Sequence, residues 1–366
     1  MRILIPILGF GRAGGYRVLS KFADELIRLG HRVKFLCPDE SPLPYYPTLA
    51  TIGWVDEKGL RSINSSKSGK QDNAFSIQKK LTRALRKIPA NSYDVIIANH
   101  ALTTFPIWIA GLRHKTLYYV QAYEPDYYKS EGIKSSILSF LSAQSYKMKF
   151  FTVVNGKTYL DYKELKSSRI LYPGIDFNLF YPTAKKLADN ADIEIIIGTI
   201  GRTEPYKGTR YVIEAFQKLG KKYANIKLHV AFGNPQDFIN YENIHCFQLH
   251  GDEELANFYR SLDYYICAAY IQLGAFHYPV SEAMSCGVPV ITTHYYPANE
   301  MNAWMVNTLE DSEEIVTQFE LAQSDPSIKQ KKIEQALMDV QQFEWKMVGE
   351  RLNNYVQELA GQLLAN

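Results

Sequence analysis

Short apolar runs alternate with longer amphipathic segments along nearly the whole chain of 366 residues. The apolar runs have the length of buried strands, and the segments between them repeat apolar residues at helical spacing. Strands that alternate with helices predict a doubly wound α/β fold with a parallel sheet. Residues 38–73 lack such a pattern and are expected to form a long loop. The expected strands are 2–8, 33–37, 93–98, 117–121, 150–154, 193–200, 226–232, 244–249, 264–268 and 288–292.

The alternation occurs twice, and a passage with proline and glycine at 169–176 separates the two halves. A chain of this length can form two hydrophobic cores. We therefore predict two doubly wound, Rossmann-like domains that face each other across a cleft, residues 1–172 and 173–345. Residues 346–366 carry an apolar stripe, and we expect them to form a C-terminal helix that packs back on the N-terminal domain.

Composition and charge narrow the class of protein. The chain is 46% hydrophobic with a net charge of only +3, which fits a soluble globular protein and is too mild to indicate nucleic-acid binding. No apolar run is long enough to span a bilayer. Residues 1–10 are expected to be a first strand rather than a signal peptide, because Pro6 interrupts the apolar run. Four scattered cysteines without metal or redox spacing favour the cytoplasm: Cys37, Cys246, Cys267 and Cys286.

A basic stretch covers residues 61–87, where eight Lys and Arg residues accompany a single acid, Asp72. Ile77, Leu81 and Leu85 recur there at helical spacing, which predicts an amphipathic helix whose basic side chains mostly face outward. Such a helix is either a solvated surface or a peripheral contact with the anionic inner face of the plasma membrane.

The stretch Ser281-Glu-Ala-Met-Ser-Cys-Gly-Val-Pro-Val-Ile291 predicts a short helix followed by a buried strand. Ser281 is the expected N-cap, Glu282 lies in the expected first turn, and Gly287 ends the helix. The start of a helix offers free N–H groups and a positive dipole end, which bind phosphate without a metal ion. A carboxylate beside it can accept two ribose hydroxyls. The stretch is therefore either a nucleoside diphosphate site or an ordinary short helix packed on a sheet.

Ligands of open parallel sheets bind outside the carboxyl ends of the strands, and polar residues follow several expected strands there. Gly14 and Gly15 follow the first strand, where they either let the backbone approach a diphosphate or satisfy a positive φ. His100 directly follows residues 93–98 and is a candidate to face a substrate. Arg202 and Lys207 can offset the charge of a departing diphosphate. A group suited to a sugar follows another strand: Gln121, Tyr123, Glu124 and Asp126.

Four motifs occur in an order and spacing that resembles glycosyltransferase family 4: Tyr172-Pro-Gly-Ile-Asp176, Gly201-Arg202 with Lys207-Gly208, Glu282-Ala-Met-Ser-Cys-Gly-Val-Pro-Val-Ile291 and Phe343-Glu-Trp345. The resemblance covers nearly the whole chain. It implies the GT-B fold and a retaining, metal-independent sugar transfer without a further cofactor. The stretch Val120-Gln-Ala-Tyr-Glu-Pro125 resembles a subgroup that includes bacterial rhamnosyltransferases of surface polysaccharides.

The resemblance also implies substrates and the roles of individual residues. The donor would be a nucleoside-diphosphate sugar, and the acceptor a glycan or a lipid-linked sugar. Three residues are implied in catalysis. Arg202 and Lys207 would hold the donor pyrophosphate, and His100 would lie beside the donor sugar. The residues implied in donor binding are Gly14, Gly15, Val280, Ser281, Glu282 and Tyr278, with Glu282 on the ribose and the backbone near Val280 and Ser281 on a phosphate.

One position departs from the family pattern. Its members usually have two glutamates eight positions apart, the first of which contacts the sugar, and counting back from Glu282 reaches Gly274. The sugar contact would then come from backbone, water, His277 or Tyr278. Either the donor sugar is unusual, such as a deoxy sugar, or donor binding is weakened.

Three other functions remain open. A sugar-nucleotide epimerase uses the same fold, and a non-catalytic nucleotide-sugar-binding protein is compatible with Gly274. A nicotinamide oxidoreductase is disfavoured, because the glycines after the first strand lack the G-x-G-x-x-G spacing.

Overall fold

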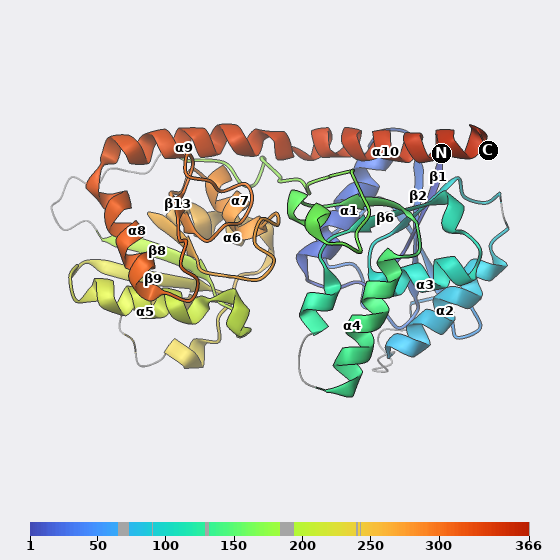
Figure 1. Ribbon diagram of the computed structural model, residues 1–366, viewed down its shortest axis with the longest axis horizontal. Coiled ribbons are helices and arrows are strands. Elements are labelled where there is room, and N and C mark those ends of the chain that lie inside the picture. The colour runs from blue at the N-terminus through green and yellow to red at the C-terminus, as the bar shows by residue number, and fades with distance from the viewer. Residues whose placement is uncertain are drawn as a thin grey trace. The chain divides into compact units, whose positions relative to one another are not determined.

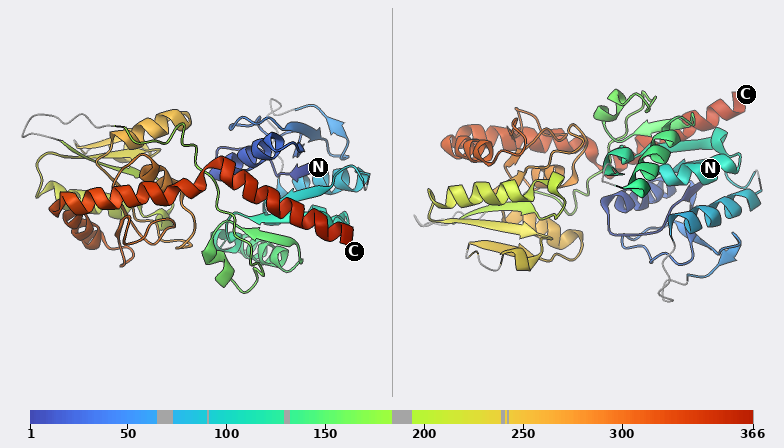
Figure 2. Two further views of the ribbon diagram at one scale, coloured as in Figure 1. Left: turned by 90° about the horizontal axis from the view of Figure 1, so that it is seen from above. Right: turned by 60° about the horizontal axis from the view of Figure 1, so that its bottom comes forward.

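The computed structural model describes residues 1–64, 73–89, 91–128, 132–183, 194–238, 241 and 243–365. The chain divides into two compact units. Unit 1 consists of Met1–Gly174 together with Trp345–Asn366, and unit 2 consists of Ile175–Glu344. Each unit is a Rossmann-like domain with a mainly parallel sheet between layers of helices (Figures 1 and 2). The predicted doubly wound α/β class is therefore confirmed.

Among its described residues, unit 1 has a seven-stranded sheet in the order β4-β3-β2-β1-β5-β6-β7. All neighbouring strands are parallel except β3 and β4. Strand order reverses between β1 and β5, which makes this the topological switch point of the sheet. The strands are β1 (Arg2–Pro6), β2 (Arg32–Pro38), β3 (Thr51–Val55), β4 (Arg61–Ser62), β5 (Val95–Ala98), β6 (Thr116–Val120) and β7 (Phe151–Val154).

Helices cover both faces of this sheet. Two of them, α1 and α10, pack together on one face, while α2, α3 and α4 lie side by side on the other (Figure 1). Apolar residues at helical spacing fix the inward side of α1, where Phe22 and Leu26 are fully buried. The helices are α1 (Gly14–Arg28), α2 (Ala74–Lys87), α3 (Ala101–Ile109), α4 (Ile133–Tyr146) and α10 (Trp345–Ala365).

Unit 2 repeats this plan with a six-stranded parallel sheet in its described residues, ordered β10-β9-β8-β11-β12-β13. Its switch point lies between β8 and β11. The strands are β8 (Ile195–Ile200), β9 (Ile226–Ala231), β10 (Ile244–Phe247), β11 (Tyr264–Cys267), β12 (Val290–Thr292) and β13 (Trp304–Met305). The helices are α5 (Thr209–Gly220), α6 (Gly251–Ser261), α7 (Tyr278–Ser285), α8 (Ser312–Ser324) and α9 (Pro326–Val340).

The expected loop over 38–73 contains strands that the sequence pattern did not reveal. β3 and β4 both lie there, and most side chains of β3 are only partly buried. Gly53 is in the middle of β3, against the side chain of Lys34. A short, half-buried strand with a central glycine lacks the alternation by which strands are recognised, so the sequence predicted a loop.

The basic helix forms as expected, with one difference. Leu81 and Leu85 of α2 are buried. Lys80 also points inward, because its Nζ lies 3.1 Å from a carboxylate oxygen of Asp39 and 3.7 Å from one of Glu40. A buried lysine needs such acidic partners, which charge patterning along the helix alone does not show. Residues 65–72 of the basic stretch, which include Asp72, lie outside the described residues.

The C-terminal helix α10 belongs to unit 1. Its first residue, Trp345, lies over Gly174, where an added Cβ would meet the indole ring at 2.4 Å. The indole also meets the ring of Phe22 edge to face, with centroids 6.1 Å apart. Further along α10, Val348, Leu352 and Val356 are fully buried. None of the helices in the described ranges is long and apolar enough to cross a membrane.

Replacing Trp345 with Ala should destabilise unit 1 by about 3–5 kcal/mol, because the truncation leaves a cavity against Gly174 and Phe22. Equilibrium denaturation followed by circular dichroism measures the change. The matched control is Met347→Ala on the same helix, where the side chain is 39% exposed and we expect a change within about 0.5 kcal/mol. Equal stability of both variants would show that the indole does not hold α10 in place.

Candidate functional site

The candidate residues of unit 2 gather at the switch point of its sheet. Arg202 and Lys207 lie in the loop after β8, and His277 and Tyr278 lie at the start of α7, which follows β11. This is the edge at which open parallel sheets bind ligands. Among the described residues, no group of three or more His, Cys, Asp and Glu side chains is arranged to hold a metal ion.

The loop after β8 is held tightly in place. Gly208 has φ +70°, and a Cβ added there would lie 2.0 Å from the carbonyl oxygen of Ala268, just after β11. Only glycine fits this backbone conformation and this close approach. The Thr209 hydroxyl accepts a hydrogen bond of 3.0 Å from the backbone N–H of Arg202. The loop that carries Arg202 and Lys207 is thereby fixed at both ends.

Three basic side chains influence one another at this loop. Burial lowers the pKa of Lys207, and the neighbouring charge of Arg202 lowers it further. The pKa of His277 falls to about 3, mainly because the ring is buried and also because Lys207 and Arg202 lie near it. His277 is therefore a neutral imidazole at neutral pH. A bound anion would relieve the repulsion between the two cations, so the cluster suits a diphosphate.

His277 is held by its neighbours from several directions. Its ring stacks on Tyr295 with centroids 4.4 Å apart. Its Nδ1 lies 4.0 Å from the Sγ of Cys267 at the end of β11, and its backbone N–H donates to the Tyr296 carbonyl. The sequence offered His277 only as one substitute for a missing glutamate. Its place beside two cations depends on the packing of β11 against α7, which the sequence pattern does not show.

The start of α7 differs from the prediction. The helix begins at Tyr278 with His277 as its N-cap, so Ser281 is not the N-cap. The backbone N–H of Ser281 donates to the His277 carbonyl at 3.1 Å and is therefore unavailable to a phosphate. Pro279 occupies the first turn, where proline is favoured, and this was the signal for the earlier start. Tyr278 and Val280 supply the backbone N–H groups of the first turn.

Glu282 consequently lies in the second turn of α7 rather than the first. Its side chain is 2% exposed, and one carboxylate oxygen accepts a hydrogen bond of 3.2 Å from the Tyr259 hydroxyl. Gly274, which stands where the family has its first glutamate, has φ +81°. A side chain at this position is strained, so the backbone itself disfavours a glutamate there.

In unit 1, His100 follows β5 at the switch point and is the N-cap of α3. Its Nδ1 accepts a hydrogen bond of 3.0 Å from the backbone N–H of Leu102. Burial lowers the pKa of His100 to about 4, so the ring is neutral. Because Nδ1 is the acceptor, the single ring proton lies on Nε2. His100 is thus a neutral hydrogen-bond donor, which is suited to a sugar hydroxyl.

Glu124 lies beside this histidine, with one carboxylate oxygen 3.8 Å from the Nε2 of His100. Its two oxygens lie 3.1 and 2.9 Å from the backbone nitrogen of Ala101, the donor of this contact. Burial raises the pKa of Glu124 to about 8. The sequence placed Glu124 only in a polar group after a strand, because pairing across β5 and β6 is not visible in the chain order.

Gly14 and Gly15 form the first turn of α1, with Ala13 as the N-cap. Neither glycine has a positive φ, so the alternative that they serve a strained loop is wrong. A Cβ on Gly15 would lie 3.0 Å from the Oε1 of Gln121, which follows β6 and was named among the residues suited to a sugar. The turn is therefore closely packed against the next polar strand end. Its contact with a diphosphate stays a prediction.

The comparison with protein families identifies the class of domain in the second half of the chain. Residues 183–337 match the family described as glycosyl transferases group 1. This segment includes the cationic loop after β8 and the whole of α7. Most of unit 2 is thus similar to the glycosyl transferases of this group. No curated protein sequence matches the chain.

Solved structures share the fold of this chain over nearly its full length. Sucrose-phosphate synthase from Thermosynechococcus elongatus has a TM-score of 0.78 at 17% identity and covers 99% of this chain and 100% of its own. HepE from Anabaena, solved with UDP and glucose, has a TM-score of 0.69 at 14% identity and covers 98% of this chain and 100% of its own. WaaG, a glycosyltransferase involved in lipopolysaccharide biosynthesis, has a TM-score of 0.70 at 15% identity and covers 97% of this chain and 99% of its own. The two units thus have the GT-B fold.

The raised pKa of Glu124 predicts a dependence of stability on pH. The folded chain keeps a proton on Glu124 up to about pH 8, whereas the unfolded chain loses it near 4.3, about the ordinary value. The free energy of unfolding should therefore fall with rising pH through this window, by at most about 1.4 kcal/mol per pH unit. His100, whose pKa is lowered, acts in the opposite direction but only below about pH 6.5.

Glu124→Gln removes this titration while keeping an acceptor for Ala101. Denaturation of both proteins between pH 6.5 and 8 should show the variant gaining stability relative to the parent as pH rises. A difference between the two proteins that stays constant over this interval would contradict the raised pKa.

Proposed function

We propose that the chain is a retaining, metal-independent glycosyltransferase of the family 4 type. It would transfer a sugar from a nucleoside-diphosphate sugar to a glycan or lipid-linked acceptor in the synthesis of a bacterial surface polysaccharide. The observation that carries the proposal is the cationic loop of Arg202 and Lys207 at the switch point of a glycosyl transferases group 1 domain. The enzyme would work in the cytoplasm, in peripheral contact with the inner membrane face.

Unit 2 supplies the groups that the donor diphosphate needs. Arg202 and Lys207 would neutralise its charge, and the first turn of α7 would donate N–H groups from Tyr278 and Val280. Glu282 would bind the ribose, and its carboxylate would then exchange the Tyr259 hydroxyl for ribose hydroxyls. HepE, solved with UDP and with UDP-glucose, supports this class of donor. The likeness to WaaG, which is involved in lipopolysaccharide biosynthesis, supports the polysaccharide role.

The chemistry follows from stabilising the leaving group. The bond between the anomeric carbon and the diphosphate oxygen breaks, and the acceptor oxygen bonds to the same carbon from the face that the diphosphate leaves. The departing diphosphate takes the acceptor proton, so no protein nucleophile is needed. The fixed cations act on charge that develops in the transition state, which is where preorganised groups accelerate a reaction. His100 would donate its Nε2 proton to a hydroxyl of the transferred sugar.

Gly274 bears on the identity of that sugar. The positive φ of Gly274 disfavours the carboxylate that usually accepts from sugar hydroxyls. A neutral His277 and the backbone around Gly274 offer fewer acceptors. We therefore propose a donor sugar that lacks a hydroxyl, such as a deoxyhexose.

The same absence of a carboxylate favours a second candidate, a non-catalytic nucleotide-sugar-binding protein. This protein would bind a nucleoside diphosphate and never release it from a donor. An epimerase on this fold would instead change the free sugar nucleotide. Chromatography of a donor incubated with acceptor separates the three, since only a transferase yields free nucleoside diphosphate together with a glycosylated acceptor.

Lys207→Ala should lower kcat/KM by a factor that corresponds to about 2.7–4 kcal/mol, the cost of losing one preorganised charge-stabilising donor. Release of nucleoside diphosphate measures the rate. Lys221→Ala is the matched control, because this lysine is exposed beyond the far end of α5. Transfer by the Lys207→Ala protein at the parental rate would refute the assignment. Thermal unfolding of each variant shows whether a loss of rate reflects misfolding.

Retention and independence of metal give a further test. The anomeric configuration of the product, read by NMR, should equal that of the donor. Addition of EDTA should leave the rate unchanged, because Arg202 and Lys207 take the place of a divalent cation at the diphosphate. An inverted product, or a rate restored only by Mg²⁺ or Mn²⁺, would contradict the proposed mechanism.

A further inference from the structure

Helix α4 carries an apolar stripe on its outer side. Its apolar residues Ile133, Ile137 and Phe140 lie at the spacing of a core-facing stripe, yet they are 81%, 52% and 62% exposed. The side that packs within unit 1 carries the fully buried Ser142 and Ser145 together with the buried ring of Tyr146. Stable packing normally buries the apolar side of a helix. The exposed stripe of α4 is therefore a surface that is built to be covered by something else.

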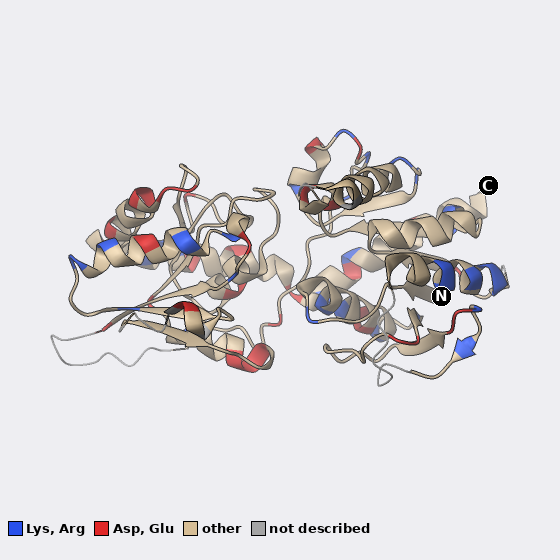
Figure 3. Cartoon of the chain, turned by 90° about the horizontal axis from the view of Figure 1, so that it is seen from below, with Lys and Arg blue, Asp and Glu red and all other residues tan. Residues whose placement is uncertain are grey.

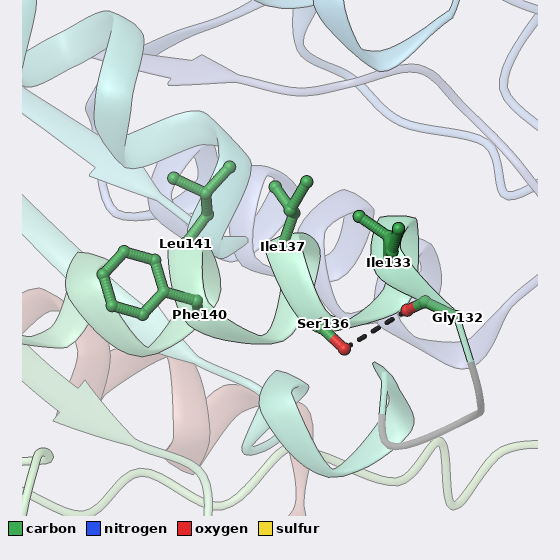
Figure 4. Close-up of a pocket in the computed structure, with 6 residues that line it drawn as sticks. All are labelled: Gly132, Ile133, Ser136, Ile137, Phe140 and Leu141. Carbon is green, nitrogen blue, oxygen red and sulfur yellow. Dashed lines mark hydrogen bonds between the residues drawn. The ribbon is translucent and has the colours of Figure 1, made fainter.

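The stripe lines a shallow pocket of about 550 Å³, formed by Gly132, Ile133, Ser136, Ile137, Phe140 and Leu141. In Figure 4, Ile133, Ile137 and Leu141 project from the same side of α4, one turn after another. The Ser136 hydroxyl donates back to the Gly132 carbonyl at 3.2 Å, which leaves the rim of the pocket mostly apolar. Such a surface accepts flexible hydrocarbon rather than polar ligands.

The neighbouring helices extend this surface and add charge. On α3, which packs against α4, Trp108 and Ile109 are 53% and 43% exposed. On α2, which packs against α3, Lys79, Arg86 and Lys87 are exposed. None of the three helices contains an aspartate or glutamate. Figure 3 views unit 1 from the side of these helices and draws Lys and Arg in blue.

We propose that the outer side of α2, α3 and α4 is a docking surface for an anionic lipid bilayer. The exposed stripe of α4, together with Trp108 and Ile109, would enter the boundary between head groups and acyl chains. The basic side chains of α2 would contact anionic head groups. Apolar area and basic charge are the two features that bind interfacial helices to such membranes.

The surface deepens the proposed function, on which its biological meaning rests, because a lipid-linked acceptor lies in the membrane. The apolar stripe of α4 and the basic side chains of α2 would both contribute to membrane binding. The basic helix alone would not hold the protein in the membrane surface. Basic charge attracts the protein over a Debye length, whereas the apolar stripe holds it once contact is made. A neutral membrane offers only the second contribution.

Sedimentation of the full-length protein with vesicles tests the proposal. The protein should bind vesicles of phosphatidylglycerol mixed with phosphatidylcholine and bind phosphatidylcholine alone much more weakly. Phe140→Asp should weaken binding to the anionic vesicles at least about tenfold. Lys79→Gln and Arg86→Gln should each weaken it about fivefold, and added salt should reduce the difference.

Met338→Asp is the matched control, because Met338 on α9 of unit 2 is also 62% exposed, and this variant should bind like the parent. Equal binding to both kinds of vesicle, or no binding to either, would overturn the proposal. So would a concentration-dependent dimer, seen by light scattering, that Phe140→Asp dissociates, since a second copy would then cover the stripe.

Thermal stabilisation by UDP, measured on the same proteins, separates this inference from the proposed function. The Phe140→Asp protein should keep the parental response to UDP. A parent that binds vesicles and ignores every nucleoside diphosphate would refute the proposed function while leaving the docking surface in place.

Discussion

The contact between Gly208 and Ala268 is the constraint on which the candidate site depends. It brings the loop after β8 against the end of β11, with no room for a side chain between them. The backbone of the loop that carries Arg202 and Lys207 is consequently held at one place, although like charges repel each other. Charge fixed in advance stabilises a leaving anion without reorganisation when the reaction occurs, which flexible surface cations cannot do. Gly208, which has no reactive side chain, thus determines the position of the loop that carries the two cations.

Burial sets the protonation of the titratable groups around both switch points. His277 and His100 are neutral because burial lowers the pKa of their rings, and the backbone N–H of Leu102 fixes which nitrogen of His100 carries the proton. Glu124, in contrast, is buried as an acid whose pKa approaches the physiological range. Neutral donors and acceptors suit a sugar, and concentrated positive charge suits a diphosphate. The two units differ in this respect, although the strand order of both sheets reverses at their first strand.

The periodicity of the sequence predicted most strands of both sheets, because buried parallel strands are continuous apolar runs. It missed β3, where a glycine and partial exposure remove the pattern, and the two-residue strands β4 and β13, which are too short to show one. It placed the candidate residues of the site at strand ends, since topology alone brings those ends together. It missed the early start of α7, where Pro279 was the overlooked signal, and it missed the pairing of Glu124 with His100. Helix α4 exposes Ile133, Ile137 and Phe140, which contradicts the rule by which the inward side of a helix is assigned from apolar spacing.

The return of α10 to unit 1 has a consequence for the order in which the molecule is made. Unit 2 is encoded by one continuous segment, whereas unit 1 needs both the first and the last residues of the chain. On the ribosome, the inserted domain can finish folding while the enclosing one still lacks the indole that covers Gly174. During synthesis, unit 1 begins first and is completed last. A chain released before α10 is made would expose the aromatic and aliphatic residues that α10 covers to chaperones and proteases.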